Sequence, residues 1–414
     1  MAANHLSVDI ETYSSVDIKK SGLYKYVQSP DFEVLLFAYS FDGEPVRIVD
    51  LTREPLPSEI IAALHSPEVI KHAYNAAFEW YCLSKYLGKR DHIQWLSQWR
   101  CTQLHGLYLG YPQGLAKIGE ALGLPADKKK MGMGTALINY FCKPCKPTRA
   151  NGFRERNYPQ NAPERWELFM EYCRRDVETE MTVEGRLSGF PVPDDIQRQW
   201  ELDTRINSYG VRLDMELITG ALECSQAITE ELIDEAVRLT GLDNPNSITA
   251  LKKWLEEETD TEIKSLNKET VSTLIGTIPE RKARRVLEIR RELGKTSVSK
   301  YRAMVNTVCA DERARGLIQF YGARTGRWAG RLVQVQNLPR PVIENIDIDF
   351  ARDLVRRHDI FMLKYAYGNV SDILSQLIRT AFIPSEGNKF AVADFSAIEA
   401  RVIAYMSLPS IVLI

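Results

Sequence analysis

The period of the hydrophobic pattern changes along this chain, and that change limits the folds it can form. Residues 5–11 (HLSVDIE) alternate strictly, and residues 32–51 read as two strands joined at Asp-Gly. A long amphipathic helix is predicted over residues 164–187. Shorter helices are predicted within residues 60–65, 75–87 and 114–122. Strands and helices mixed in this way predict an α/β region that ends near Gly189.

The remainder of the chain has a different pattern. GFPVPDD (residues 189–195) reads as a linker, because its prolines end one helix and its acidic residues suit the start of the next. Residues 196–308 are almost entirely helical in pattern, with predicted N-caps at Ser247 and Asn267. After Gly316 the chain becomes rich in Gly, Arg and Pro. The predicted domains are residues 1–190, 191–315 and 316–414.

Composition and charge narrow the class of protein. The chain has 44% apolar and 9% aromatic residues, as in ordinary globular proteins. Its formal net charge of −2 provides no overall basic field, although residues 281–302 carry nine Lys/Arg against two Glu. Seven cysteines, no secretory leader pattern and no long uncharged apolar run predict an intracellular protein with free thiols.

Two acidic residues lie on the first predicted strand. Strict alternation places Asp9 and Glu11 on the same face, opposite Val8 and Ile10. Carboxylates side by side repel each other unless a cation lies between them. By itself, this pair is also typical of a solvent-exposed strand surface.

Two further pairs have helical spacing. Asn75 and Glu79 are four residues apart, so they share a helix face, and so do Tyr172 and Asp176 at the edge of a predicted apolar stripe. A carboxylate beside the core is unfavourable without a partner. Taken alone, the pair Asn75 and Glu79 is more typical of a polar helix surface.

Together, in this order and spacing, the three segments resemble the proofreading-type 3′–5′ exonucleases of the DEDD class, whose fold is RNase H-like. The resemblance implies a two-metal site for Mg²⁺ or Mn²⁺ held by four carboxylates, Asp9, Glu11, Glu79 and Asp176. It also implies that Tyr172 orients the attacking water and that Asn75 contacts DNA. The family usually has Asp at the position of Glu79, so we expect a metal site adapted to a longer side chain.

A cysteine pair also has metal-ligand spacing. Cys142 and Cys145 lie in FCKPCKP, but no second Cys or His pair follows to complete a tetrahedral site. We therefore expect no zinc. The nearby run Lys128–Lys130 fits either a solvated surface or a contact with single-stranded DNA.

The later part of the chain resembles family A DNA polymerases. Segments of residues 196–308 match, in order, those that lead into the family's thumb. ARTGRWAGRLVQVQNLPR (residues 323–340) is similar to its Thr-Gly-Arg…Gln-Asn-Leu/Ile-Pro segment. This resemblance implies minor-groove contacts with a primer–template at Thr325, Arg327, Gln336 and Asn337.

KFAVADFSAIEARVIAYM (residues 389–406) resembles the first palm motif of the same family. The resemblance implies that Asp394, at the end of a buried strand, holds catalytic metal and that Glu399 packs against the sugar of the incoming nucleotide. Phe395 and Ala397 replace the more usual Tyr and Gln, a variation that resembles the phage-type branch of the family. This resemblance implies that the protein acts in the cytoplasm of a bacterial host cell.

The fingers and the second palm motif do not follow in these 414 residues. We therefore expect a truncated or split polymerase in which the exonuclease site is complete and the polymerase site is not. A companion fragment that carries the fingers and the remaining palm is a possible partner. Two alternatives remain open. In the first, Glu79 has inactivated the nuclease, so that the chain is a DNA-binding remnant without catalytic activity. In the second, the chain is a stand-alone DEDD-type RNase.

Overall fold

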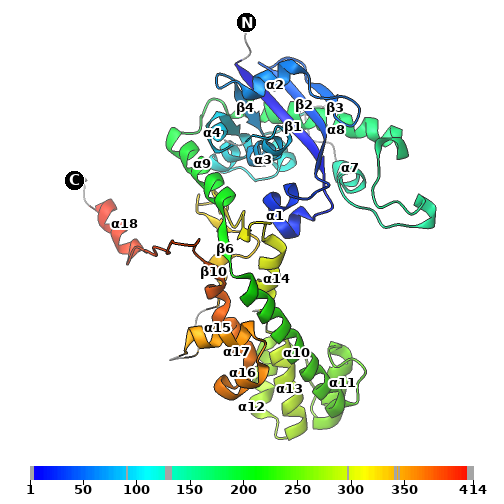
Figure 1. The fold of residues 1–414 in the computed structure, drawn as a ribbon, viewed down its shortest axis with the longest axis vertical. Helices are drawn as coiled ribbons and strands as arrows, with labels where there is room; N and C mark the ends of the chain where they lie inside the picture. Colours follow the sequence, from blue (N-terminus) through cyan, green and yellow to red (C-terminus); the bar gives the residue numbers. More distant parts are fainter. Residues whose placement is uncertain are drawn as a thin grey trace.

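The computed structural model describes residues 4–89, 92–125, 133–295, 298–339, 343 and 346–407. The chain is elongated, with a sheet and its helices at one end and a helical arm at the other (Figure 1). Lys128–Lys130 lie outside the described residues.

A five-stranded mixed sheet organises the first part of the chain. Its order is β3-β2-β1-β4-β5. The strands are β1 (His5–Tyr13), β2 (Glu33–Phe41), β3 (Arg47–Asp50), β4 (Ile70–Ala73) and β5 (Trp99–Cys101). β2 is antiparallel to β1 and β3, whereas β4 is parallel to β1 and β5. The predicted Asp-Gly turn is confirmed, because Asp42 and Gly43 both have positive φ between β2 and β3.

Helices cover both faces of this sheet. They are α1 (Ile18–Val27), α2 (Ser58–His65), α3 (Ala76–Tyr86), α4 (His92–Trp95), α5 (Thr102–Tyr108), α6 (Leu115–Ala121), α7 (Gly134–Phe141) and α8 (Pro163–Leu187). Alternate residues of β2 enter different cores: Leu36 packs with the α7 and α8 side chains, and Phe37 packs with Trp80 of α3. This alternation follows from the pleat of the strand. The chain is therefore mixed α/β here, as predicted.

The helical arm follows α8 after a short linker. Its elements are α9 (Asp194–Tyr209), β6 (Val211–Leu213), α10 (Met215–Thr240), α11 (Ile248–Thr259), α12 (Lys268–Thr277), α13 (Arg281–Leu293) and α14 (Val298–Thr307). Both predicted N-caps are confirmed, since Ser247 accepts from the Ala250 amide and Asn267 from the Thr270 amide. α11, α12 and α13 enclose a small apolar core of their own.

The arm is tied to segments much later in the sequence. β6 pairs with β7 (Arg313–Ala314) on one side and β10 (Phe382–Ile383) on the other. Three helices, α15 (Ile348–Arg356), α16 (Ile360–Tyr367) and α17 (Val370–Leu377), share a core with α10 and α14. At Gly220 a β-carbon would lie 2.3 Å from the Val355 carbonyl oxygen, so glycine allows α10 and α15 to approach closely.

The prediction of a strand within residues 389–395 is wrong. Residues 389–395 form no strand in the part of the chain that the structure describes, and Val392 is 92% exposed. A strand needs a neighbouring strand to pair its backbone groups, and no described residue provides one here. Ile398–Ser407 form α18, the helix that the sequence predicts, which projects away from the other elements (Figure 1).

No helix in the described residues is both long enough and apolar enough to cross a membrane.

Candidate functional site

Four acidic side chains predicted from sequence converge between the sheet and two helices. Asp9 and Glu11 come from β1, Glu79 from α3 and Asp176 from α8. Glu11, Glu79 and Asp176 are buried, and Asp9 is half-buried. The charges of Asp9 and Glu11 both raise the pKa of Glu79, and the charge of Asp176 raises the pKa of Tyr172, as do those of Asp9 and Glu11. We call this group the carboxylate cluster.

Local structure helps to place each member of the cluster. The pairing of β1 with β2 shifts register between Glu11 and Thr12. Such an irregularity turns a side chain away from the direction that regular pleating would give it. Glu79 lies in the first turn of α3, where the helix dipole favours a negative charge.

Glu79 is a buried member of the cluster whose carboxylate is incompletely hydrogen-bonded within the described residues. Its side chain is 4% exposed, and Oε2 has no hydrogen-bond partner among the described residues. Burial raises its pKa well above its usual range, and the charge of Asp9 is the next largest cause. A buried carboxylate with acidic neighbours is stabilised by a proton or by a cation.

One face of α8 continues the cluster beyond the predicted residues. Tyr172 hydrogen-bonds Asp176, and Glu180 follows one turn later as the acceptor of the Thr102 hydroxyl. Burial raises the pKa of Glu180 to about 7. Sequence reasoning missed Glu180, although its four-residue spacing from Asp176 was the signal that could have found it.

Tyr172 is held in a tight space. Its ring is 2% exposed and stacks on Phe169. Burial raises the pKa of its hydroxyl, and so does the negative charge of Asp176. The hydroxyl therefore stays protonated at neutral pH and can donate a hydrogen bond.

Two buried thiols border the carboxylates. Cys173 Sγ lies 3.6 Å from Asp9 Oδ2, and Cys142 Sγ lies 3.8 Å from Glu11 Oε2. Burial and the neighbouring acids raise both thiol pKa values well above the usual range. Cys145 instead contacts the Arg154 carbonyl oxygen at 3.3 Å, so the two cysteines of FCKPCKP have different partners.

The cluster has the donor chemistry of a divalent-cation site without a preformed coordination geometry. Among the described residues, no three His, Cys, Asp or Glu side chains are already arranged to hold a metal ion. The carboxylate oxygens are nevertheless the donors that Mg²⁺ and Mn²⁺ prefer. The buried Glu79 Oε2, which lacks a hydrogen-bond partner among those residues, fits such an ion.

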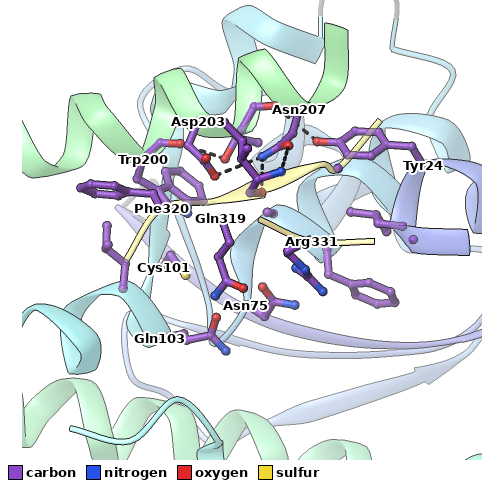
Figure 2. A pocket seen from close by; sticks show the side chains of 18 of the residues that line it. Tyr24, Asn75, Cys101, Gln103, Trp200, Asp203, Asn207, Gln319, Phe320 and Arg331 are labelled. Carbon is purple, nitrogen blue, oxygen red and sulfur yellow. Dashed lines mark hydrogen bonds between the residues drawn. The ribbon is translucent and has the colours of Figure 1, made fainter. Parts of the chain in front are cut away.

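A cavity of about 220 Å³ lies next to the start of α3. Figure 2 shows Asn75, Gln103, Gln319 and Arg331 directed toward the same space, with Trp200 and Phe320 beside it. The Asn75 side chain makes no capping bond to its own helix. The cavity therefore combines residues of the sheet region with residues just before and within the predicted primer-binding segment.

The predicted primer-binding residues lie near a basic groove. Asn337 lines a cavity of about 660 Å³ with five basic side chains: Lys268, Arg290, Arg291, Lys295 and Lys300. Thr325, Arg327 and Gln336 are exposed on the segment that leads to it. At Gly330 a β-carbon would overlap the Gln336 amide, so these residues are in close contact.

The two predicted palm residues lie neither in the carboxylate cluster nor in the basic groove. Asp394 lies in the exposed segment before α18, and Glu399 is in the first turn of that helix. Both side chains are exposed. Their predicted roles remain predictions.

Comparisons with known proteins identify a polymerase relative. No protein-family model matches the chain. It is 52% identical over 404 residues to a DNA polymerase of Bacillus phage SP02, which covers 97% of this chain and 61% of the relative's length. The solved POL domain of Pol1 from M. smegmatis, in complex with DNA primer-template and dNTP, is 15% identical with a TM-score of 0.54. That match covers 98% of this chain and 59% of the other, and it shows a shared fold. The predicted resemblance to a DNA polymerase is confirmed.

Proposed function

We propose that this relative of a phage DNA polymerase is the exonuclease and DNA-holding part of a family A enzyme. Residues 1–190 would form the DEDD-type, RNase H-like exonuclease domain, residues 191–315 the helical linker and thumb, and residues 316–414 the start of the palm. The substrate proposed for the exonuclease is a single-stranded 3′ DNA end.

The observation that supports the exonuclease is the convergence of β1, α3 and α8 at the carboxylate cluster. Asp9, Glu11 and Asp176 would hold two divalent ions together with Glu79. Bound ions of this kind stabilise the entering and leaving oxygens of a phosphodiester displacement. Tyr172, protonated and bonded to Asp176, would orient the attacking water, and Asn75 would contact the strand at the start of α3.

The basic groove is proposed to hold the primer–template. Lys268, Arg290 and Arg291 suit contacts with phosphates, and Asn337 suits a shape-dependent contact in the minor groove. Lys295 and Lys300 are already engaged, with Asp372 and with the Val333 carbonyl oxygen. Thr325, Arg327 and Gln336 would extend that contact along the duplex. Affinity for DNA would then arise locally, although the net charge of the chain is −2.

Template-directed synthesis is proposed for the whole protein rather than for these 414 residues alone. Asp394 lies in an exposed segment that pairs with no strand among the described residues. Two-metal nucleotidyl transfer needs carboxylates held in a fixed geometry, and the remaining palm and the fingers would provide that geometry and close on Glu399. These parts could belong to the same polypeptide or to a companion fragment.

The test is digestion of a 3′-labelled single strand in Mg²⁺ or Mn²⁺. We expect release of mononucleotides, which Asp9→Ala and Asp176→Ala abolish. Wild type and Asp9→Ala that digest the strand equally slowly would show that the site is assigned wrongly. Preference for RNA ends would favour a stand-alone RNase, and DNA binding without any digestion would favour a silent remnant.

A further inference from the structure

A basic loop leaves the sheet region between α7 and α8 (Figure 1). It comprises residues 142–158 (CKPCKPTRANGFRERNY), with one acidic residue, Glu155. The basic residues are Lys143, Lys146, Arg149, Arg154 and Arg156. The loop begins beside the carboxylate cluster, since Cys142 contacts Glu11, and it leads into the helix that carries Tyr172 and Asp176.

Polar contacts, rather than an apolar core, give the basic loop a defined shape. The Cys145 amide donates to the Glu155 carbonyl oxygen at 2.7 Å, closing the loop on itself. Asn151 donates to the Lys146 carbonyl oxygen, and its own backbone amide is capped by Thr148. Buried Asn157 anchors the base by donating to the Tyr140 carbonyl oxygen at 3.0 Å.

Some of the basic side chains are used inside the molecule. Arg154 donates to Asn157 and to the Asn151 carbonyl oxygen. Arg156 pairs with Glu33 and lies over the Tyr13 ring. These contacts hold the base of the loop. The Arg154 and Arg156 side chains are therefore not available to a ligand.

The tip presents a different set. Lys146 and Arg149 are exposed, and neither side chain has a partner in the part of the chain that the structure describes. Phe153 is 68% exposed and has φ +56°, a conformation that residues with side chains rarely adopt. An exposed ring in an unfavourable backbone conformation contributes nothing to the core, so a contact outside the chain would explain it.

We propose that the tip of the basic loop binds the single-stranded DNA whose 3′ end enters the carboxylate cluster. Lys146 and Arg149 contact phosphates, and the Phe153 ring stacks on a base. Proteins that bind single strands commonly combine cationic side chains, which contact phosphates, with exposed aromatic rings. The rings stack on bases of any sequence, because every base has a flat face. The inference rests on the proposed exonuclease, which would then bind the strand at a second point outside its active site.

Binding is measured first without chemistry. The probe is fluorescent oligothymidylate in EDTA, titrated with the full chain at several salt concentrations. We expect Lys146→Ala/Arg149→Ala to weaken binding and to reduce the slope of log K against log [salt] by about 1.4, since each phosphate contact to a single strand contributes about 0.7. Phe153→Ala should weaken binding about tenfold with an unchanged slope.

Two controls separate binding from folding. Arg47→Ala/Lys85→Ala removes the same charge from exposed positions of the sheet region outside the loop, and its affinity should match wild type. Phe153→Gly should lose affinity while its melting temperature equals or exceeds that of wild type, because glycine tolerates positive φ.

The proposal is overturned if the loop variants keep wild-type affinity and salt slope, if the control double variant loses as much, or if only duplex DNA is bound. Hydrolysis of the p-nitrophenyl ester of thymidine 5′-monophosphate in Mn²⁺ tests the active site separately, because this substrate does not reach the loop. Loop-dependent binding without that hydrolysis would reject the exonuclease and retain the DNA contact.

Discussion

Gly134 at the start of α7 lies directly against the ring of Tyr172 on α8: a β-carbon at position 134 would be 2.1 Å from Cε2 of that ring. No side chain fits between the two helices at this point. The position of Tyr172 beside the carboxylate cluster therefore depends on a residue outside the cluster.

Gly134→Ala should move the Tyr172 ring and reduce the exonuclease rate. A displacement of about 1 Å can lower a rate about 100-fold, and overpacking lowers the free energy of unfolding by about 1–3 kcal/mol. Single-turnover digestion of a labelled strand and thermal melting measure the two effects. Gly185→Ala on α8 is the matched control, because a β-carbon there meets nothing within 4 Å. A Gly134→Ala rate equal to wild type would show that the Tyr172 position is not critical.

Divalent ions should stabilise the folded chain through Glu79. Its buried, acidic surroundings favour a bound cation, and a ligand at about 100 times its Kd adds about 2.7 kcal/mol to the free energy of unfolding. Mn²⁺ should therefore raise the melting temperature of wild type more than that of Glu79→Gln, and EDTA should reverse the rise. Equal shifts in both proteins would place the ion elsewhere.

Glu79→Asp should lower the exonuclease rate if the site is adapted to the longer side chain. Shortening the residue withdraws the carboxylate by about one bond length, and metal sites tolerate little displacement. The comparison is the digestion rate at saturating Mg²⁺. A clear gain of rate in Glu79→Asp would contradict this adaptation.

Asp203 should make stability depend on pH. It accepts hydrogen bonds from Trp328 and Asn207, and burial raises its pKa from 3.8 to about 6. The folded state then binds the proton more tightly than the unfolded state, so this contribution is present below pH 4 and is lost as the pH rises through 6. The loss is on the order of 3 kcal/mol. Urea unfolding from pH 4 to 7 should show a flatter dependence for Asp203→Asn, and an unchanged profile would exclude this residue.

The basic groove should dominate the salt dependence of duplex binding. Arg290→Ala/Arg291→Ala removes two phosphate contacts, so the slope of log K against log [salt] should fall by about 1.8. Lys252→Ala/Lys253→Ala is the control, because those lysines pair with Glu256 and Glu257 on α11. Fluorescence anisotropy with a primer–template provides the slopes, and equal slopes for both double variants would place the DNA elsewhere.

Primer extension should be absent with these 414 residues alone. Asp394 lies on an exposed segment that no strand of the described residues pairs with, and so lacks the fixed geometry that two-metal transfer requires. The assay uses a primer–template and all four nucleotides, with Asp394→Ala as control. Synthesis that disappears in the control would contradict the expectation.

Local sequence patterns were sufficient for the elements and for several site residues. Period-two alternation predicted β1, four-residue spacing placed Tyr172 and Asp176 on one face of α8, and side-chain chemistry predicted the caps at Ser247 and Asn267. These features depend on neighbours within one or two turns of chain, so the sequence by itself determines them.

Only the tertiary structure decided which of those residues meet. The contact of Gly134 with Tyr172, the thiol of Cys142 beside Glu11, and the pairing of β6 with β10 join positions far apart in the chain. The predicted strand at residues 389–395 failed for the same reason, since its apolar pattern satisfies a strand only where another strand pairs with it. Pattern specifies what a segment can form, whereas packing against distant residues decides what it contacts.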